Sequence, residues 1–167
     1  MLYHVSEEPS IACFEPRETS TGQPVVWGVH PDRLRNYLLP RDCPRVTYFA
    51  AGDTTSEDVD RFLGASTAVV AFESDWLDRV RQARLYVYEF SEAGFACVDD
   101  TAGYFQSESA VRPHRVEVVD DCLGALANQG VEVRFVHSLW PLHDAVVAST
   151  LGYSIIRMRN AQPKIAG

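Results

Sequence analysis

The irregular order of short β-forming and helix-forming segments constrains this chain more than any single motif. Runs rich in β-branched and aromatic residues predict strands, over residues 2–5, 24–29, 46–50, 68–72, 84–90, 115–119, 131–136 and 153–158. Cap residues and apolar spacing predict short helices, over residues 33–38, 56–63, 74–80, 123–127 and 141–150. Residues 95–108 mix strand and turn signals. Because consecutive strands recur without a helix between them, a purely parallel doubly wound sheet is not expected. The predicted fold class is α+β, with a mixed, mostly antiparallel, split sheet and short helices.

The size of the chain predicts one folded unit with its own core. It has 167 residues, of which 46% are hydrophobic and 23% charged, and such a length buries most of its apolar surface. We expect a single globular domain over residues 1–161 and a frayed tail over residues 162–167. The three tryptophans, Trp27, Trp76 and Trp140, are expected in the core.

The charge balance argues against nucleic acid and anionic membranes as partners. The chain carries 15 basic and 23 acidic residues, a formal charge of −8, whereas phosphate-backbone binding needs a basic face. No run approaches the roughly 18 apolar residues of a membrane span, and the first residues do not form a signal peptide. A cytoplasmic location is therefore expected. In that setting the cysteines, which form no CxxC pair, are expected as reduced thiols without a metal site.

The common motifs of catalysis are absent from the sequence. It has no GxGxxG, P-loop, GxSxG, HExxH or EF-hand pattern, which disfavours the commonest kinase, dehydrogenase, hydrolase and zinc-protease designs. A His143–Asp144 pair occurs near a predicted helix start. We interpret that segment mainly as a helix start with Trp140 packed into the core.

Two predicted strands carry weak signals of ligand binding. His4, on the first strand, could hydrogen-bond a ligand hydroxyl, or could be a structural histidine bonded to a neighbouring carbonyl. Tyr48 and Phe49 end a strand just before a polar turn and a helix. There an exposed ring could stack on a flat ligand, although both residues could equally be ordinary strand residues with one in the core.

Charged residues near other predicted strands give two further signals. Glu108 lies between Ser107 and Ser109; a carboxylate there could stabilise positive charge developing on a sugar carbon, or could be a solvated loop residue. Three arginines lie in loops beside the first strands, and arginine favours bidentate phosphate or carboxylate partners. The alternative is a surface salt-bridge cluster with Asp42. These arginines are Arg17, Arg41 and Arg45.

Taken in order, His4 after Tyr3, Tyr48 before a helix and Glu108 on a later strand resemble the His-Tyr-Glu arrangement of the ADP-ribosyltransferase-like clan. The resemblance implies that clan's fold and NAD as co-substrate. It implies that His4 binds ribose, Tyr48 stacks on nicotinamide and Glu108 is the catalytic carboxylate. An arginine among Arg17, Arg41 and Arg45 would bind the pyrophosphate.

Several residues depart from the clan pattern. Val-Ser follows His4 where many transferases have Gly-Thr, and Tyr37 and Tyr104 compete with Tyr48 for the stacking role. A related activity of the clan removes a 2′-phosphate from RNA with NAD, using a histidine and several arginines. The acidic charge of this chain makes an RNA partner unexpected. The opening residues, Leu-Tyr-His-Val-Ser-Glu-Glu-Pro-Ser and then Phe-Glu-Pro-Arg, also look like those of a family of small uncharacterised bacterial proteins.

Three functional hypotheses follow. The first is an NAD-using ADP-ribosyltransferase-like enzyme, and the second is a non-catalytic module that binds a nucleotide or another small ligand. The third is a partner-binding protein, for example a homodimer. A pocket with His4, an aromatic ring and Glu108 would favour the first, and a pocket with Glu108 in solvent would favour the second. A flat apolar patch without a pocket would favour the third.

Overall fold

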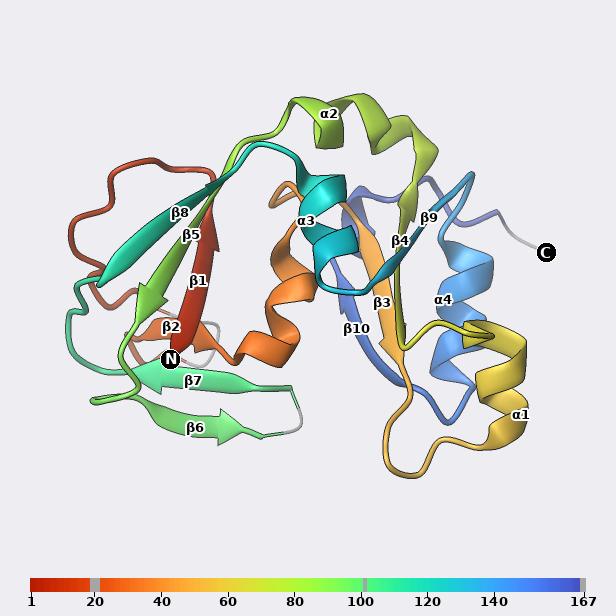
Figure 1. Ribbon diagram of the computed structural model, residues 1–167, viewed down its shortest axis with the longest axis horizontal. Helices are drawn as coiled ribbons and strands as arrows, with labels where there is room; N and C mark the ends of the chain where they lie inside the picture. The colour runs from red at the N-terminus through yellow and green to blue at the C-terminus, as the bar shows by residue number, and fades with distance from the viewer. Residues whose placement is uncertain (19–21, 101, 166–167) are drawn as a thin grey trace. The chain divides into compact units, whose positions relative to one another are not determined.

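The computed structural model describes residues 1–18, 22–100 and 102–165 and divides into two compact units (Figure 1). Unit 1 comprises Met1–Leu38 and Arg84–Asp120, and unit 2 comprises Leu39–Ala83 and Asp121–Gly167. Each unit has its own sheet, mostly or wholly antiparallel, with short helices. The predicted α+β class is therefore confirmed. The expectation of one domain over residues 1–161 stays a prediction.

In the described part of unit 1, six strands form one antiparallel sheet in the order β6-β7-β2-β1-β5-β8. A 3-10 helix, η1 (Pro31–Tyr37), follows β2 directly, with Pro31 in its first turn. The strands are β1 (Leu2–Ser6), β2 (Val26–Val29), β5 (Leu85–Phe90), β6 (Ala96–Asp99), β7 (Tyr104–Ser107) and β8 (Arg115–Val119).

The core of unit 1 lies on one face of this sheet. Leu2 pairs with Phe90 and His4 with Tyr88 across β1 and β5, so their side chains share a face. Phe14 covers that face, with its ring 5.0 Å from those of both Tyr88 and Phe90 in edge-to-face geometry. Burying each of these aromatic side chains stabilises the unit by roughly 1.5–3 kcal/mol.

Unit 2 contains a four-stranded sheet in the order β10-β3-β4-β9 within its described residues. The β4–β9 pair is parallel, and the other two pairs are antiparallel. The strands are β3 (Arg45–Phe49), β4 (Ala68–Glu73), β9 (Glu132–Val136) and β10 (Gly152–Ile156). All six residues of β4 are buried, as expected for a central strand with both faces covered.

Short helices cover the sheet of unit 2. In Figure 1, α1 and α4 lie side by side against it, and their segments pack into one apolar cluster with Val46, Tyr48 and Val69. The helices are α1 (Ser56–Asp58), which continues as the π-helix η2 (Val59–Leu63), η3 (Ser74–Trp76), α2 (Leu77–Gln82), α3 (Cys122–Asn128), α4 (Trp140–Val147) and η4 (Met158–Asn160).

The cap residues explain where two of these helices begin. Thr55 Oγ1 accepts the N–H of Asp58 at 3.3 Å, and Asp121 Oδ1 accepts the N–H of Gly124 at 2.9 Å. Each bond satisfies one of the N–H groups that a helix start leaves without an intrahelical acceptor. Both helices were predicted from the sequence, over residues 56–63 and 123–127.

One expectation about the interior differs from the structure. Trp27 is 37% exposed, so its predicted core position is wrong; its indole packs edge-on against Tyr104 on the surface of the sheet. Trp76 and Trp140 are half-buried. In the segment predicted as a frayed tail, Gln162 N–H donates to Glu73 Oε2 at 2.8 Å and Lys164 pairs with Asp144.

Among the described residues, none of the helices combines the length and apolar character that crossing a bilayer requires.

Candidate functional site

His4 lies on β1 with its ring against the core of unit 1. Its Nδ1 is 3.1 Å from the carbonyl oxygen of Trp27, and its ring centroid is 4.9 Å from that of Phe14. A ring nitrogen bonded to a carbonyl carries the proton and donates. This geometry corresponds to the structural-histidine alternative, although the half-buried ring still has exposed surface.

Tyr48 lies in the centre of unit 2 and has no exposed surface. Its hydroxyl accepts a hydrogen bond from Arg134 at 2.9 Å, and its ring contacts Phe62. Burial raises the pKa of the Tyr48 hydroxyl, and the guanidinium of Arg134 opposes this effect. A ring that is enclosed on both faces cannot stack on nicotinamide in this structure.

The competing tyrosines belong to unit 1 and contact one another. The Tyr37 hydroxyl donates to that of Tyr104 at 2.9 Å, and both side chains are half-buried.

Glu108 follows the last residue of β7 and is exposed. One of its carboxylate oxygens accepts a hydrogen bond from Gln23 at 3.3 Å. It does not line the pocket described below. In the sheet order, β2 lies between β1, which carries His4, and β7, which leads to Glu108.

The three arginines have different environments. Arg17 is exposed, and its backbone forms a two-bond bridge with Val25 in unit 1. Arg41 is exposed in unit 2. Arg45 is only 2% exposed, and its guanidinium donates to the carbonyl oxygen of Pro40 at 2.9 Å. Asp42, the partner proposed for these arginines, instead pairs with Arg157 at 3.7 Å.

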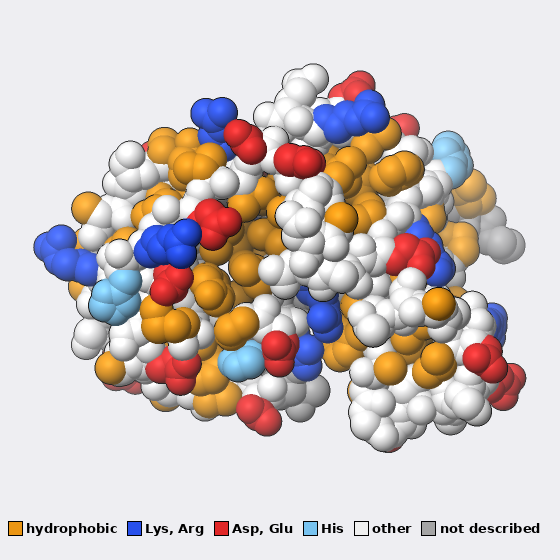
Figure 2. Space-filling model, viewed as in Figure 1, with side chains coloured by type: hydrophobic (Ala, Val, Ile, Leu, Met, Phe, Trp, Pro, Cys, Tyr) orange, Lys and Arg blue, Asp and Glu red, His pale blue; other side chains and the backbone are white. Residues whose placement is uncertain are grey.

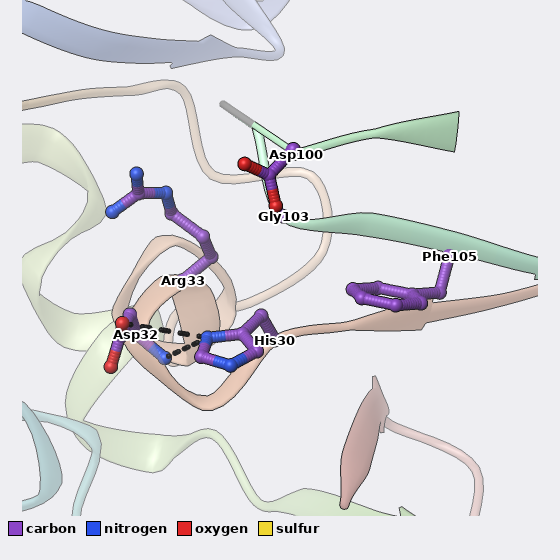
Figure 3. A pocket seen from close by; sticks show the side chains of 6 residues that line it. All are labelled: His30, Asp32, Arg33, Asp100, Gly103 and Phe105. Carbon is purple, nitrogen blue, oxygen red and sulfur yellow. Dashed lines mark hydrogen bonds and ion pairs between the residues drawn. The ribbon is translucent and has the colours of Figure 1, made fainter. Parts of the chain in front are cut away.

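A pocket of about 250 Å³ opens in unit 1 at the start of η1, beside the turn between β6 and β7 (Figure 3). It combines two basic residues, two carboxylates, an aromatic ring and a glycine. Its lining residues are His30, Asp32, Arg33, Asp100, Gly103 and Phe105. In Figure 3, His30, Asp32 and Arg33 come from the β2–η1 junction, and the other three come from the β6–β7 hairpin.

Gly103 holds the two sides of this pocket together. Its carbonyl oxygen accepts the N–H of His30 at 2.9 Å. Its φ is +66°, in the left-handed region that glycine tolerates best. A Cβ at this position would lie 2.8 Å from Arg33 Cγ and 3.1 Å from His30 Cβ. A glycine here therefore permits both the turn and the close approach of η1.

His30 caps η1 and orients its own ring. Nδ1 of His30 accepts the N–H of Asp32 at 3.4 Å and lies 3.5 Å from Asp32 Oδ2. When the imidazole is neutral and Nδ1 accepts, Nε2 carries the proton and donates. Together with the guanidinium of Arg33, the pocket then presents two donor groups beside two carboxylates.

The thiols of Cys13 and Cys43 are held in their protonated form. Burial raises the pKa of the Cys43 thiol to about 12, and the pKa of Cys13 is also raised, first by burial and then by Glu15. Protonated thiols are poor nucleophiles. The described residues contain no group of three or more His, Cys, Asp or Glu side chains that could hold a metal ion.

The pocket residues were not predicted from the sequence. The sequence predicted only a helix over residues 33–38 and mixed strand and turn over residues 95–108, with no functional role for either segment. Nothing in the sequence indicated that residues 30–33 and 100–105, about 70 positions apart, would meet, because that contact depends on the pairing of β2 with β7.

The fold and the pocket define an α+β protein with a small polar site in one of its two units. Over residues 3–161 the sequence matches a family of unknown function (DUF6886), and the chain belongs to this family. Neither the curated proteins nor the solved structures contain a significant match.

Proposed function

We propose that unit 1 binds a small anionic ligand at the His30–Arg33 pocket without catalysing a reaction on it. One observation carries this proposal. Arg33 and His30, from one segment, meet Phe105 and Asp100, from another, around a cavity whose wall at Gly103 has no room for a side chain. Such a concave site with a few convergent polar groups is the usual form of a ligand pocket.

The side chains indicate the chemistry of the ligand. The planar guanidinium of Arg33 suits phosphate or carboxylate oxygens, and His30 adds a second donor. The carboxylates of Asp32 and Asp100 can accept hydrogen bonds from ligand hydroxyls. Phe105 offers an aromatic surface for a sugar or a base. A phosphorylated sugar or a mononucleotide combines all of these groups.

The size of the pocket limits the ligand further. At about 250 Å³ it falls just below the range of about 300–1,000 Å³ that is usual for pockets enclosing drug-sized ligands. We therefore expect it to take one phosphorylated sugar or nucleotide and to leave the second half of a dinucleotide outside.

One feature favours binding over catalysis. Glu108, the carboxylate expected to be catalytic, is exposed and is not part of the lining.

An NAD-using transferase with an ADP-ribosyltransferase-like fold is the second candidate. His4 lies on β1 and Glu108 directly follows β7, two strands of one sheet in unit 1, which is the observation in its favour. Tyr48 is not retained as the stacking residue, because it has no exposed surface. NAD is therefore included in the ligand panel below.

The test is a thermal-shift and calorimetric titration with ribose 5-phosphate, AMP, NAD and inorganic phosphate. A ligand that binds only the folded state raises its melting temperature. Arg33→Ala should weaken binding by about tenfold or more, since a hydrogen bond to a charged group contributes roughly 1.5–3 kcal/mol. Arg112→Ala is the matched control, because it removes the same charge from an exposed site of unit 1 outside the pocket lining.

The outcomes separate the two candidates. Binding of ribose 5-phosphate or AMP that is lost in Arg33→Ala and kept in Arg112→Ala supports the proposed pocket. Binding of NAD alone, kept in Arg33→Ala and accompanied by release of nicotinamide that Glu108→Gln abolishes, supports the transferase. The absence of binding by every compound in the panel contradicts both.

A further inference from the structure

Strand β8 forms one edge of the sheet in unit 1. It pairs with β5 on one side, and on the other side no strand from the described residues pairs with it. The backbone N–H and C=O groups along that side are free to pair with another strand. Its five residues alternate charged and apolar side chains, Arg115-Val116-Glu117-Val118-Val119.

The apolar side chains of β8 are exposed. Val116 and Val118 are 41% and 51% exposed, respectively. They lie opposite Tyr88 and Tyr86 of β5, so they extend the face of the sheet that carries the core. On the face shown in Figure 2, Lys, Arg, Asp and Glu side chains are interspersed with apolar ones. Two neighbouring exposed valines on a free edge favour pairing with a further strand.

The charges of β8 are complementary to those of a second β8. Arg115 and Glu117 lie on the same face of the strand, with side chains 69% and 64% exposed and their charged atoms 4.0 Å apart. If two copies pair antiparallel about a two-fold axis at Val116, Arg115 faces Glu117 of the partner subunit. By symmetry Glu117 also faces Arg115 of the partner subunit. Opposite charges across a strand pair stabilise it, by roughly 0.2–1 kcal/mol for each pair.

The neighbouring register is disfavoured by the same argument. A two-fold axis at Glu117 would place that carboxylate opposite Glu117 of the partner subunit, and like charges directly opposite are destabilising. Of these two registers, the charges of β8 favour the one centred on Val116, in which Val116 also meets Val116 of the partner subunit.

The other edge of the same sheet lacks this regularity. In β6 the register with β7 is irregular between Cys97 and Asp99, and a bulge of this kind protects an edge from pairing. The register of β8 with β5 is unbroken from Arg115 to Val119. Of the two edges, β8 is the one that presents a continuous strand.

We infer that β8 is an interface with a second copy of this chain, which joins the two sheets by antiparallel β8–β8 pairing about Val116. The pairing is short, so the dimer forms reversibly and its population depends on concentration. The occupant is a second copy because the charge pattern of β8 is complementary to itself. This inference does not depend on the proposed ligand pocket.

Sedimentation velocity over a concentration series tests the interface through charge reversal. Arg115→Glu and Glu117→Arg each place like charges opposite one another in the homodimer, and each should weaken self-association by about tenfold or more. The double variant R115E/E117R restores complementary pairs and should restore the dimer. An equimolar mixture of the two single variants should form a heterodimer, because each faces opposite charges on the other.

The double variant and the mixture also separate an effect on the interface from an effect on folding. Dimer formation by the double variant and by the mixture, with circular dichroism spectra unchanged in all variants, supports the β8 interface. A monomer at every concentration overturns it. A dimer whose dissociation constant in both single variants is unchanged from that of the parent protein also overturns it, because another surface then forms the contact.

Discussion

The backbone N–H of His30 donates to the carbonyl oxygen of Gly103 at 2.9 Å. This single bond joins the residue after β2 to the residue before β7. It places the start of η1 against the β6–β7 turn, which is where the two halves of the pocket meet. The geometry of the pocket therefore depends on a glycine that itself has no functional group.

The first prediction concerns Gly103→Ala. The new Cβ would combine a φ of +66° with a contact of 2.8 Å to Arg33 Cγ. We expect a loss of stability of about 1–3 kcal/mol and weaker ligand binding, because Arg33 must move. Gly94→Ala is the control, since its φ is +85° but nothing lies within 4 Å of the added Cβ. Urea denaturation should show a larger loss for Gly103→Ala; equal losses would show that the contact with Arg33 is unimportant.

The second prediction concerns Tyr48. Because its ring is fully buried, Tyr48→Ala should cost about 3–5 kcal/mol of stability, as large aromatic truncations in cores do. Tyr48→Phe keeps the ring and loses only the bond from the charged guanidinium of Arg134, so it should cost less, about 1.5–3 kcal/mol. Neither loss depends on a ligand. If Tyr48→Ala melts like the parent protein and selectively loses NAD binding, the core position of Tyr48 is wrong.

The third prediction concerns the pH dependence contributed by Asp58. Its Oδ2 accepts bonds from both the N–H and the hydroxyl of Thr150, at 2.7 and 2.6 Å, and these bonds lower the pKa of the carboxyl below its ordinary value of 3.8. A carboxyl whose pKa is lower in the folded state contributes stability above pH 3.8. That stability is lost as the pH falls through the folded-state pKa.

Asp58→Asn should therefore lower the melting temperature at neutral pH. It should also reduce the further fall in melting temperature as the pH drops below 3.8. Asp60→Asn, at an exposed position two residues along, serves as control. The measurement is the melting temperature of the three proteins as a function of pH. Parallel curves for all three would contradict the role given to the Thr150 bonds.

The fourth prediction concerns Glu73, which is 1% exposed. Its carboxylate accepts the N–H of Leu139, just before α4, at 3.0 Å, and the N–H of Gln162 at 2.8 Å. A glutamine offers one acceptor oxygen, so Glu73→Gln deprives one of these N–H groups of its acceptor. The expected cost is roughly 1–3 kcal/mol. The control is Glu57→Gln, at an exposed site, for which denaturant titration should show almost no change in the free energy of unfolding. A similarly small change for Glu73→Gln would contradict the prediction.

The local structure was predictable because local chemistry specifies it. Caps such as Thr55 and Asp121 mark helix starts, and alternating residues such as those of β8 mark strands; the structure confirms these elements. The α+β class follows from their order. Trp27 was misplaced because a large aromatic side chain is usually buried, whereas this one packs on Tyr104 at the sheet surface.

The candidate site was not predictable in the same way. Whether His4 and Tyr48 contact a ligand or a core depends on what covers their face of the sheet. The covering rings, Phe14 and Phe62, lie outside the strands that carry these residues, and local patterns do not determine where those segments fold. The pocket depends on strand pairing between β2 and β7. Local patterns do not determine which strands become neighbours. The sequence therefore did not indicate that residues 30–33 would contact residues 100–105.

The central claim is that the His30–Arg33 pocket binds a small phosphorylated ligand. The most direct measurement is a two-dimensional NMR titration of the ¹⁵N-labelled protein with ribose 5-phosphate and with AMP. The account predicts saturable shifts of the amides of His30, Arg33, Gly103 and Phe105, which Arg33→Ala removes. Saturable shifts confined to residues outside that pocket, or no shift with either compound, would contradict it.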